Sequence, residues 1–187
     1  MVELRMRCLP LLAIATAISA PAAAAVVGVG PGGFIIAREV QVAAAPERVY
    51  RSYVEDYGRW WHPAHSWSGD ALNITLEARP GGCLCERWAG GASQHMSVGH
   101  VEPGRVLRLV GGLGPLQQLG LSGTLNLNFE AAGQGTLLKL EYRIAGFDPA
   151  GFDKLAPLVD GVLGEALGRL KSFVEIGAPA PGPASSP

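Results

Sequence analysis

The sequence predicts an α+β fold, in which a curved antiparallel β-sheet wraps around one long C-terminal α-helix. Between residues 72 and 145, apolar residues recur at every second position, as they do in half-buried strands. From about residue 153 to 175 they recur at three- and four-residue spacing, as along one face of a helix. Because a sheet with one polar face must bury its other face, this helix is the expected packing partner.

The composition indicates a single folded domain with a large core. Hydrophobic residues make up 48% of the 187 residues and charged residues only 17%, which argues against intrinsic disorder. Fifteen basic residues stand against sixteen acidic ones, and no stripe of Lys or Arg is present. We therefore expect neither a nucleic-acid partner nor an anionic membrane surface as a partner.

The N-terminus has the pattern of a secretory signal peptide over residues 1–25. Arg5 and Arg7 precede a mostly apolar run at 8–18, and small residues follow through Ala25. Prolines and hydroxyl residues interrupt the apolar run, whereas a membrane-spanning helix needs about 20 apolar residues. We expect cleavage after Ala24 or Ala25 and no stable membrane insertion afterwards. The mature protein would then be periplasmic or secreted.

Two further segments flank the predicted domain. Residues 26–33 (VVGVGPGG) are predicted to be a flexible N-terminal segment, and a phosphate-binding loop is not expected because no strand precedes them. Residues 177–187 contain only Gly, Ala, Pro and Ser, which predicts a disordered tail. The folded domain is therefore expected at 34–176.

The elements of that domain follow from periodicity and turn residues. Pro46 is placed to open a helix that ends before Gly58, and a short helical turn is expected at 59–61. A long helix at about 153–175 closes the chain. The predicted strands are 34–43, 72–78, 83–88, 94–102, 105–110, 121–129 and 138–144.

This order of elements resembles the START-like (SRPBCC) superfamily over residues 34–176. The stretches WWHPAHSWSGDA (60–71), ARPGGCLCE (78–86) and DKLAPLVDGVLG (153–164) resemble a bacterial subset. That subset is labelled polyketide cyclase/dehydrase and lipid-transport-like, or heat-shock ATPase activator-like. The resemblance implies a helix-grip fold with an internal cavity between sheet and helix. The resemblance does not imply any catalytic residues in this chain.

Glu86 and His100 are the candidate polar residues of that cavity. One strand pairing places both on the inner face of the sheet and His95 on the outer face. The same pairing gathers these apolar residues on the inner face: Leu84, Trp88, Met96 and Val98. Glu86 and His100 could then act as general base and acid. In the alternative, Glu86 pairs with a basic side chain near the cavity mouth and His100 reaches solvent.

Aromatic and apolar residues are expected to bind the ligand. The segment 60–67 is predicted either to border the cavity mouth, where indole rings stack on a flat ligand, or to form a satellite core. Leu163 and Leu167 represent the apolar face of the C-terminal helix. The predicted ligand-binding set is Trp60, Trp61, Trp67, Glu86, Trp88, Met96, Val98, His100, Leu163 and Leu167.

Cys83 and Cys85 are the only cysteines of the expected mature protein. Residues i and i+2 of an extended strand lie near the upper end of the ~4.4–6.8 Å Cα range of disulfides, so no bridge between them is expected. They are weak metal candidates, with His62, His65 and His95 as additional ligands. No cofactor is expected, and semi-buried thiols are the favoured interpretation.

Gly161, Gly164 and Gly168 fall on one side of the C-terminal helix. Each glycine costs about 1 kcal/mol relative to alanine inside a helix, so close packing of a second subunit there would explain them. A homodimer through these residues is therefore one hypothesis. Simple tolerance of glycine is the other.

Three functions remain from these observations. The first is an exported binder or carrier of a hydrophobic or aromatic small molecule. The second is a cyclase-, dehydratase- or hydrolase-like enzyme that uses Glu86 and His100. The third is a protein-interaction module of the heat-shock ATPase activator type. We favour a binder over an enzyme, because a binder needs only the cavity, whereas an enzyme also needs a positioned acid/base pair. No nucleophile elbow, phosphate loop or HExxH motif occurs to support familiar hydrolase or kinase mechanisms.

Overall fold

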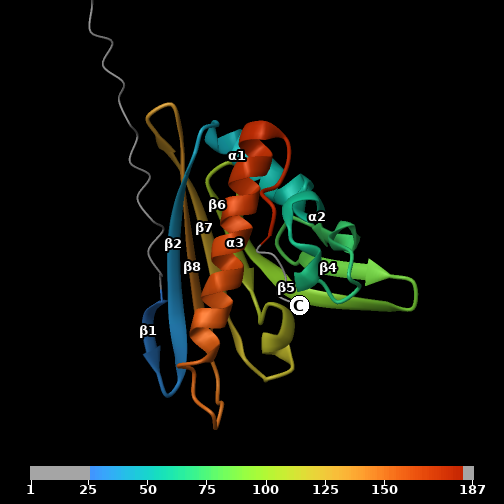
Figure 1. Ribbon diagram of the computed structural model, residues 1–187, viewed down its shortest axis with the longest axis vertical. Helices are drawn as coiled ribbons and strands as arrows, with labels where there is room; N and C mark the ends of the chain where they lie inside the picture. The colour runs from blue at the N-terminus through green and yellow to red at the C-terminus, as the bar shows by residue number, and fades with distance from the viewer. Residues whose placement is uncertain (1–25, 183–187) are drawn as a thin grey trace, which may run out of the picture.

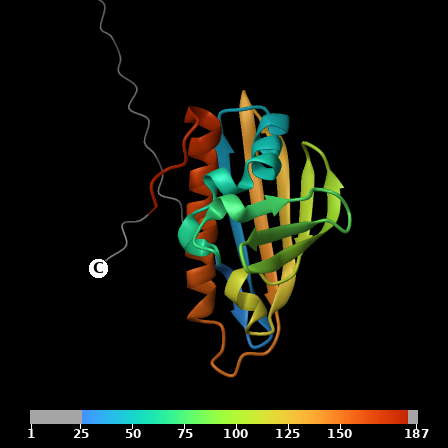
Figure 2. The ribbon, with the colours of Figure 1, turned by 90° about the vertical axis from the view of Figure 1, so that its right-hand side faces the viewer.

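A computed structural model describes residues 26–182 and has the predicted α+β helix-grip architecture. One eight-stranded antiparallel sheet has the order β1-β2-β8-β7-β6-β5-β4-β3, and helix α3 packs across one of its faces (Figure 1). Figure 2 shows the curved sheet on one side and α3 on the other. The predicted signal peptide (1–25) and residues 183–187 lie outside the described residues.

The element bounds follow the periodicity of the sequence closely. The helices are α1 (Pro46–Glu55), α2 (Tyr57–Trp60) and α3 (Leu155–Ile176), with short 3₁₀ turns η1 (Pro63–His65), η2 (Ala71–Asn73) and η3 (Gly114–Gln117). The strands are β1 (Val26–Gly30), β2 (Gly33–Val42), β3 (Ile74–Leu76), β4 (Cys83–Trp88), β5 (Gly91–Glu102), β6 (Val106–Val110), β7 (Ser122–Ala132) and β8 (Gly135–Ala145).

The core lies between the inner face of the sheet and α3. Leu127, Leu140 and Ile36 come from three neighbouring strands and are buried in one hydrophobic cluster that also contains Leu170 of the helix. α3 ends where Gly177 adopts a left-handed conformation (φ 79°), which is the usual helix stop. Within residues 26–182, no helix is both long enough and apolar enough to span a bilayer.

The predicted flexible segment at 26–33 is instead ordered as a strand and a turn. β1 pairs antiparallel with β2, so that Val29 lies opposite Phe34. The edge of β2 would otherwise present a row of unpaired backbone groups, and β1 covers it. Gly33 closes the turn at φ 149°, where a Cβ atom would lie 2.0 Å from the Ile144 carbonyl oxygen.

Residues 177–182, expected to begin the disordered tail, pack back onto the domain. Arg169 on α3 donates through Nη1 to the carbonyl oxygen of Ala180 at 2.7 Å. Ser172 Oγ donates to the carbonyl oxygen of Ala178 at 2.8 Å. The segment therefore has fixed partners up to the last described residues.

The strand expected at 72–78 is shorter than the sequence indicates. Its first residues form η2, because the Asp70 carboxylate accepts a hydrogen bond from the Leu72 N–H at 2.9 Å and caps a helical turn there. Only 74–76 remain as β3, which pairs with β4 through Ile74 opposite Glu86.

β5 contains two β-bulges that alter which of its side chains face the core. In its pairing with β4, the register passes from Met96 to Gln94, so that no β4 residue lies opposite His95. In its pairing with β6, it passes from Val98 to His100 and leaves out Gly99. Each extra residue reverses the inward and outward alternation beyond it, because side chains in a strand alternate with period two.

The glycines of α3 do not form one exposed stripe. Gly164 lies under the Arg38 side chain of β2, and a Cβ atom there would be 2.6 Å from Arg38 Cζ. A Cβ atom at Gly161 or Gly168 would meet no other part of the described chain within 4 Å. The close approach that explains Gly164 is therefore intramolecular. A homodimer through Gly161 and Gly168 stays a prediction, and Gly164 no longer supports it.

Candidate ligand-binding site

A cavity of about 360 Å³ lies between α3 and the β3–β5 end of the sheet. Its volume falls in the range of small-molecule sites. The wall is almost entirely apolar or aromatic, and it draws on α2, α3 and the η1 and η3 turns as well as the sheet. The lining residues are Tyr57, Trp61, Ala64, His65, Ser66, Trp67, Ile74, Leu84, His95, Leu113, Gly114, Pro115, Leu116, Leu155, Leu158, Val159, Val162 and Leu163.

Glu86 lies on the inner face of β4, as predicted, and is fully buried. Its two carboxylate oxygens accept hydrogen bonds from the Trp67 N–H at 3.0 Å and the Ser68 N–H at 2.6 Å. A third bond joins Oε2 to His95 Nε2 at 3.0 Å. Glu86 thereby ties the segment that carries Trp67, a wall residue, to the sheet.

The environment keeps Glu86 ionised. Burial raises the pKa of its carboxyl group, but the polar contacts with Ser68, the Trp67 N–H group and His95 outweigh that effect. The net result is a pKa below the ordinary value. Glu86 is therefore a carboxylate that accepts, and the His95 Nε2 atom facing it carries the proton.

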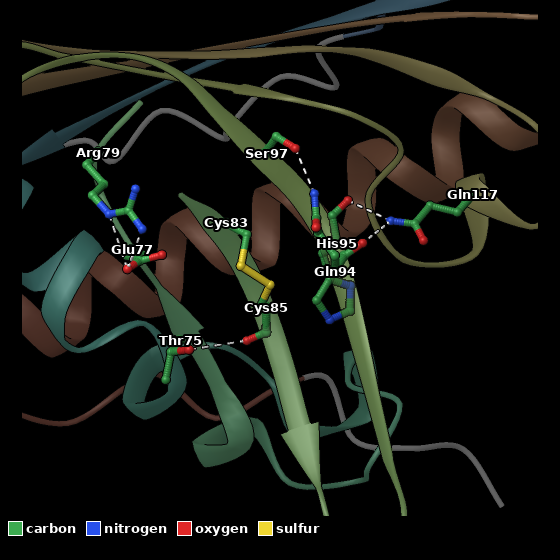
Figure 3. Close-up of a disulfide and its surroundings, with 9 residues drawn as sticks. All are labelled: Thr75, Glu77, Arg79, Cys83, Cys85, Gln94, His95, Ser97 and Gln117. Carbon is green, nitrogen blue, oxygen red and sulfur yellow. Dashed lines mark hydrogen bonds and ion pairs between the residues drawn. A yellow bond between two sulfur atoms is a disulfide. The ribbon is translucent and has the colours of Figure 1, made fainter. Parts of the chain in front are cut away.

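The bulge in β5 turns His95 inward, although the uninterrupted register places it on the outer face. The side chain is only 3% exposed and forms part of the cavity wall. Its Nδ1 atom has no hydrogen-bond partner among residues 26–182. Gln117 Nε2 donates to the carbonyl oxygens of Gln94 and His95 at 2.6 and 2.7 Å and so satisfies the acceptors at the bulge (Figure 3).

The predicted pairing of Glu86 with His100 is wrong. The bulge at Gly99 reverses the alternation, so His100 lies opposite Arg108, while Val101 lies opposite the buried Leu107. His100 Nε2 lies 3.2 Å from Glu102 Oε1 at a half-exposed position. A glycine within a strand is a known sign of a bulge, and it is the only feature of the sequence that indicated this change.

The predicted ligand-binding residues divide into two groups. Trp61, Trp67 and Leu163 line the cavity, and Trp67 is the exposed one. Trp60 is buried in the core, where its indole Nε1 donates to the Ser52 carbonyl oxygen at 3.0 Å. The others also lie outside the cavity wall. Four of them are buried (Glu86, Met96, Val98 and Leu167), Trp88 is half-buried and His100 is half-exposed.

Cys83 and Cys85 form a disulfide, which corrects the prediction that they do not (Figure 3). An ideal strand separates residues i and i+2 by about 6.4–6.8 Å, but these Cα atoms are 5.4 Å apart. The pairing of β4 with β5 is irregular at Leu84 and Cys85, and a bulge bends the strands locally. As a disulfide, the two sulfurs offer no thiolate ligands, so the metal hypothesis for them fails in this state.

His62, His65 and Glu165 place their ligand atoms within 4.8 Å of one another, which is a spacing that a metal ion could use. However, His62 Nδ1 accepts the Ala64 N–H at 3.1 Å, so the neutral ring carries its proton on Nε2 and cannot ligate there. His65 Nε2 lies 3.2 Å from Glu165 Oε2. We interpret the group as a polar contact that joins η1, a cavity wall, to α3.

Comparison with known proteins shows the fold alone. No family model and no curated protein matches the chain. Among solved structures, a conserved protein of unknown function from Enterococcus faecalis has a TM-score of 0.58 at 16% identity, over 82% of this chain and 78% of its own. The Aha1 dimer of Colwellia psychrerythraea has a TM-score of 0.56 at 18% identity, over 76% of this chain and 97% of its own. CalU16 of Micromonospora echinospora has a TM-score of 0.53 at 18% identity, over 78% of each chain.

Proposed function

We propose that this chain, which has the START-like (SRPBCC) helix-grip fold, binds an apolar, ring-containing small molecule outside the cytoplasm. The cavity between α3 and the sheet carries the proposal. It has about 360 Å³ of space and a wall of aliphatic and aromatic side chains. Burial of an apolar ligand there is favourable by about 25 cal/mol per Å² of apolar surface removed from water. Nothing in that process requires a catalytic group.

Filling the cavity is expected to abolish binding. Val162 lines the cavity from α3, and Val162→Trp places an indole ring in the space that the ligand needs. Wild-type protein should enhance the fluorescence of the neutral probe N-phenyl-1-naphthylamine saturably, and the variant should bind it at least about tenfold more weakly. Val110→Trp makes the same change at an exposed position of β6 and should bind as wild type does. Equal binding by all three proteins, with unchanged melting temperatures, would place the probe outside the cavity.

Export is the second part of the proposal and rests on the pattern of residues 1–25. Protein recovered from the periplasm or the medium is expected to begin at Ala25 or Val26. Its intact mass should rise by that of two hydrogen atoms on reduction, because the Cys83–Cys85 disulfide forms in an oxidising compartment. Full-length chains that stay inside the cell with three reactive thiols, Cys8 included, would contradict export.

Proton-transfer catalysis is a second candidate, and the Glu86–His95 pair favours it. A carboxylate that orients an imidazole at a cavity wall is an arrangement that general bases use. The pair takes the place of the predicted Glu86 and His100. Catalysis would appear as consumption of a hydroxylated ligand over time by wild type and not by His95→Gln. The protein-interaction alternative rests on fold likeness to the Aha1 dimer alone.

A further inference from the structure

We infer that His95 is the polar anchor of the cavity, and that the ligand is a neutral apolar molecule carrying a hydroxyl group, such as a phenol or an enol. The inference rests on the proposed function, because it concerns the same cavity. It is carried by three features of the described residues. They are the burial of His95 at the cavity wall beside the ionisable Glu86 behind it, the bulge that places His95 there, and the lack of a partner for its Nδ1 atom.

Attachment of the Trp67–Ser68 segment to the sheet does not require His95 beside Glu86. Glu86 already holds Trp67 and Ser68 through their N–H groups, at 3.0 and 2.6 Å. His95 supplies a third hydrogen bond to the buried carboxylate, but a neutral amide donor would supply the same bond without taking a second ionisable group out of water. His95 is nevertheless buried beside Glu86. A role in the attachment of the loop therefore does not account for the imidazole.

The placement of His95 depends on an irregularity in the sheet. An uninterrupted β5 would direct His95 to the outer face, and the extra residue in the register turns it toward the core. The bulge leaves carbonyl oxygens that Gln117 must satisfy from another segment. β-Bulges often lie beside functional sites, where they redirect one side chain. Here the redirected side chain is His95, which lines the cavity and bonds to Glu86 behind the wall.

The hydrogen-bonding state of His95 defines what it can recognise. Glu86 accepts at Nε2, so that atom carries the proton and the neutral ring presents a lone pair at Nδ1. This lone pair has no partner among residues 26–182, and an unsatisfied buried acceptor is costly. A ligand hydroxyl donates to such an acceptor, whereas a ketone or ether oxygen cannot. The apolar wall disfavours a charged donor such as an ammonium group.

The walls around His95 favour a ring system as the body of the ligand. Tyr57, Trp61 and Trp67 contribute aromatic side chains to the cavity, and Val159 and Leu163 face it from α3. Aromatic rings pack against flat ligands by stacking and edge contacts. The site therefore fits a flat apolar ring whose single polar group reaches the imidazole.

Two probes of similar shape test the inference: 1-naphthol and 1-methylnaphthalene. Wild-type protein is expected to bind 1-naphthol about tenfold more tightly, which corresponds to about 1.4 kcal/mol. The preference should fall in His95→Gln, because glutamine can still donate to Glu86 through Nε2, while its acceptor Oε1 lies on a flexible chain and not at the position of the ring Nδ1 atom. His100→Gln makes the same chemical change at the half-exposed histidine and should keep the preference. Quenching of tryptophan fluorescence and competition with N-phenyl-1-naphthylamine report the affinities.

The outcomes separate the inference from the proposed function. If both probes bind wild type equally and His95→Gln changes neither affinity, the cavity binds apolar ligands and the inference is overturned. If neither probe binds wild type, the proposed function fails and the inference fails with it. Should His95→Gln not fold, wild-type protein labelled with ¹⁵N-histidine decides. 1-Naphthol must then shift the His95 Nδ1 resonance more than 1-methylnaphthalene does, and equal shifts would overturn the inference.

Discussion

Replacement of Glu86 by alanine is expected to lower the free energy of unfolding by about 3–5 kcal/mol, because three hydrogen-bond donors lose one shared buried acceptor. The substitution leaves the N–H groups of Trp67 and Ser68 and the Nε2–H of His95 without their acceptor. Each unsatisfied buried donor costs about 1–3 kcal/mol, less what local relaxation recovers. Urea unfolding monitored by circular dichroism measures the change.

Glu102→Ala provides a matched control for Glu86. Glu102 also lies 3.2 Å from a histidine, His100, but both side chains are 44% exposed. Water replaces the lost contact there, so the expected change is below about 1 kcal/mol. Similar losses in the two variants would show that burial does not distinguish the pairs. If Glu86→Ala does not fold, Glu86→Gln keeps one acceptor oxygen and should show an intermediate loss.

The same carboxylate is expected to make stability depend on acid pH. The folded-state pKa of Glu86 is lowered, so its contribution is complete above the unfolded-state value of about 4.3 and is lost as pH falls through the lower folded-state value. The stability difference between wild type and Glu86→Gln should therefore narrow below about pH 4.3. Urea unfolding of both proteins from pH 7 to pH 3.5 tests this, and a constant difference would contradict it.

Replacement of Asp160 by alanine is expected to cost about 3 kcal/mol and to weaken ligand binding as well. Asp160 on α3 is 4% exposed, and its two carboxylate oxygens accept from Arg38 Nε at 2.6 Å and Nη2 at 2.7 Å. The variant leaves a largely buried guanidinium without this carboxylate. Because the ion pair joins α3 to β2 beside Val159, its loss should also loosen the helical wall of the cavity.

Two kinds of control isolate the Asp160 effect. Glu141→Ala removes a similar contact, at 2.7 Å from Arg143, but on the surface, and should change stability by less than about 1 kcal/mol.

Gly164→Ala presses a methyl group against the Arg38 guanidinium, the partner of Asp160, and should destabilise the protein. Gly168→Ala meets no such obstacle and should stabilise it by up to about 1 kcal/mol. A neutral Gly164→Ala variant would show that Arg38 moves aside without loss.

The amino-acid sequence by itself determined the kinds of element in this protein and their order. The two-residue period of β7 and β8 and the apolar arc of α3 come from local patterns, and each pattern has one compact solution. The same alternation placed Glu86 on the inner face of β4. The extra residue of the irregular β4–β5 pairing lies on β5, and β4 pairs with β3 without a bulge, so the alternation along β4 itself is kept. The cavity between sheet and helix was implied by the resemblance to the START-like superfamily and not by these patterns.

Only the tertiary structure decided which histidine meets Glu86. Periodicity treats each strand as regular, but a bulge arises from the pairing of two strands, so His95 and His100 exchanged faces without any change in composition. The same irregular pairing accompanies a Cα separation that allows the Cys83–Cys85 disulfide, which an ideal strand would not favour. β1 likewise forms because β2 offers it a free edge, which its own glycine-rich sequence does not reveal.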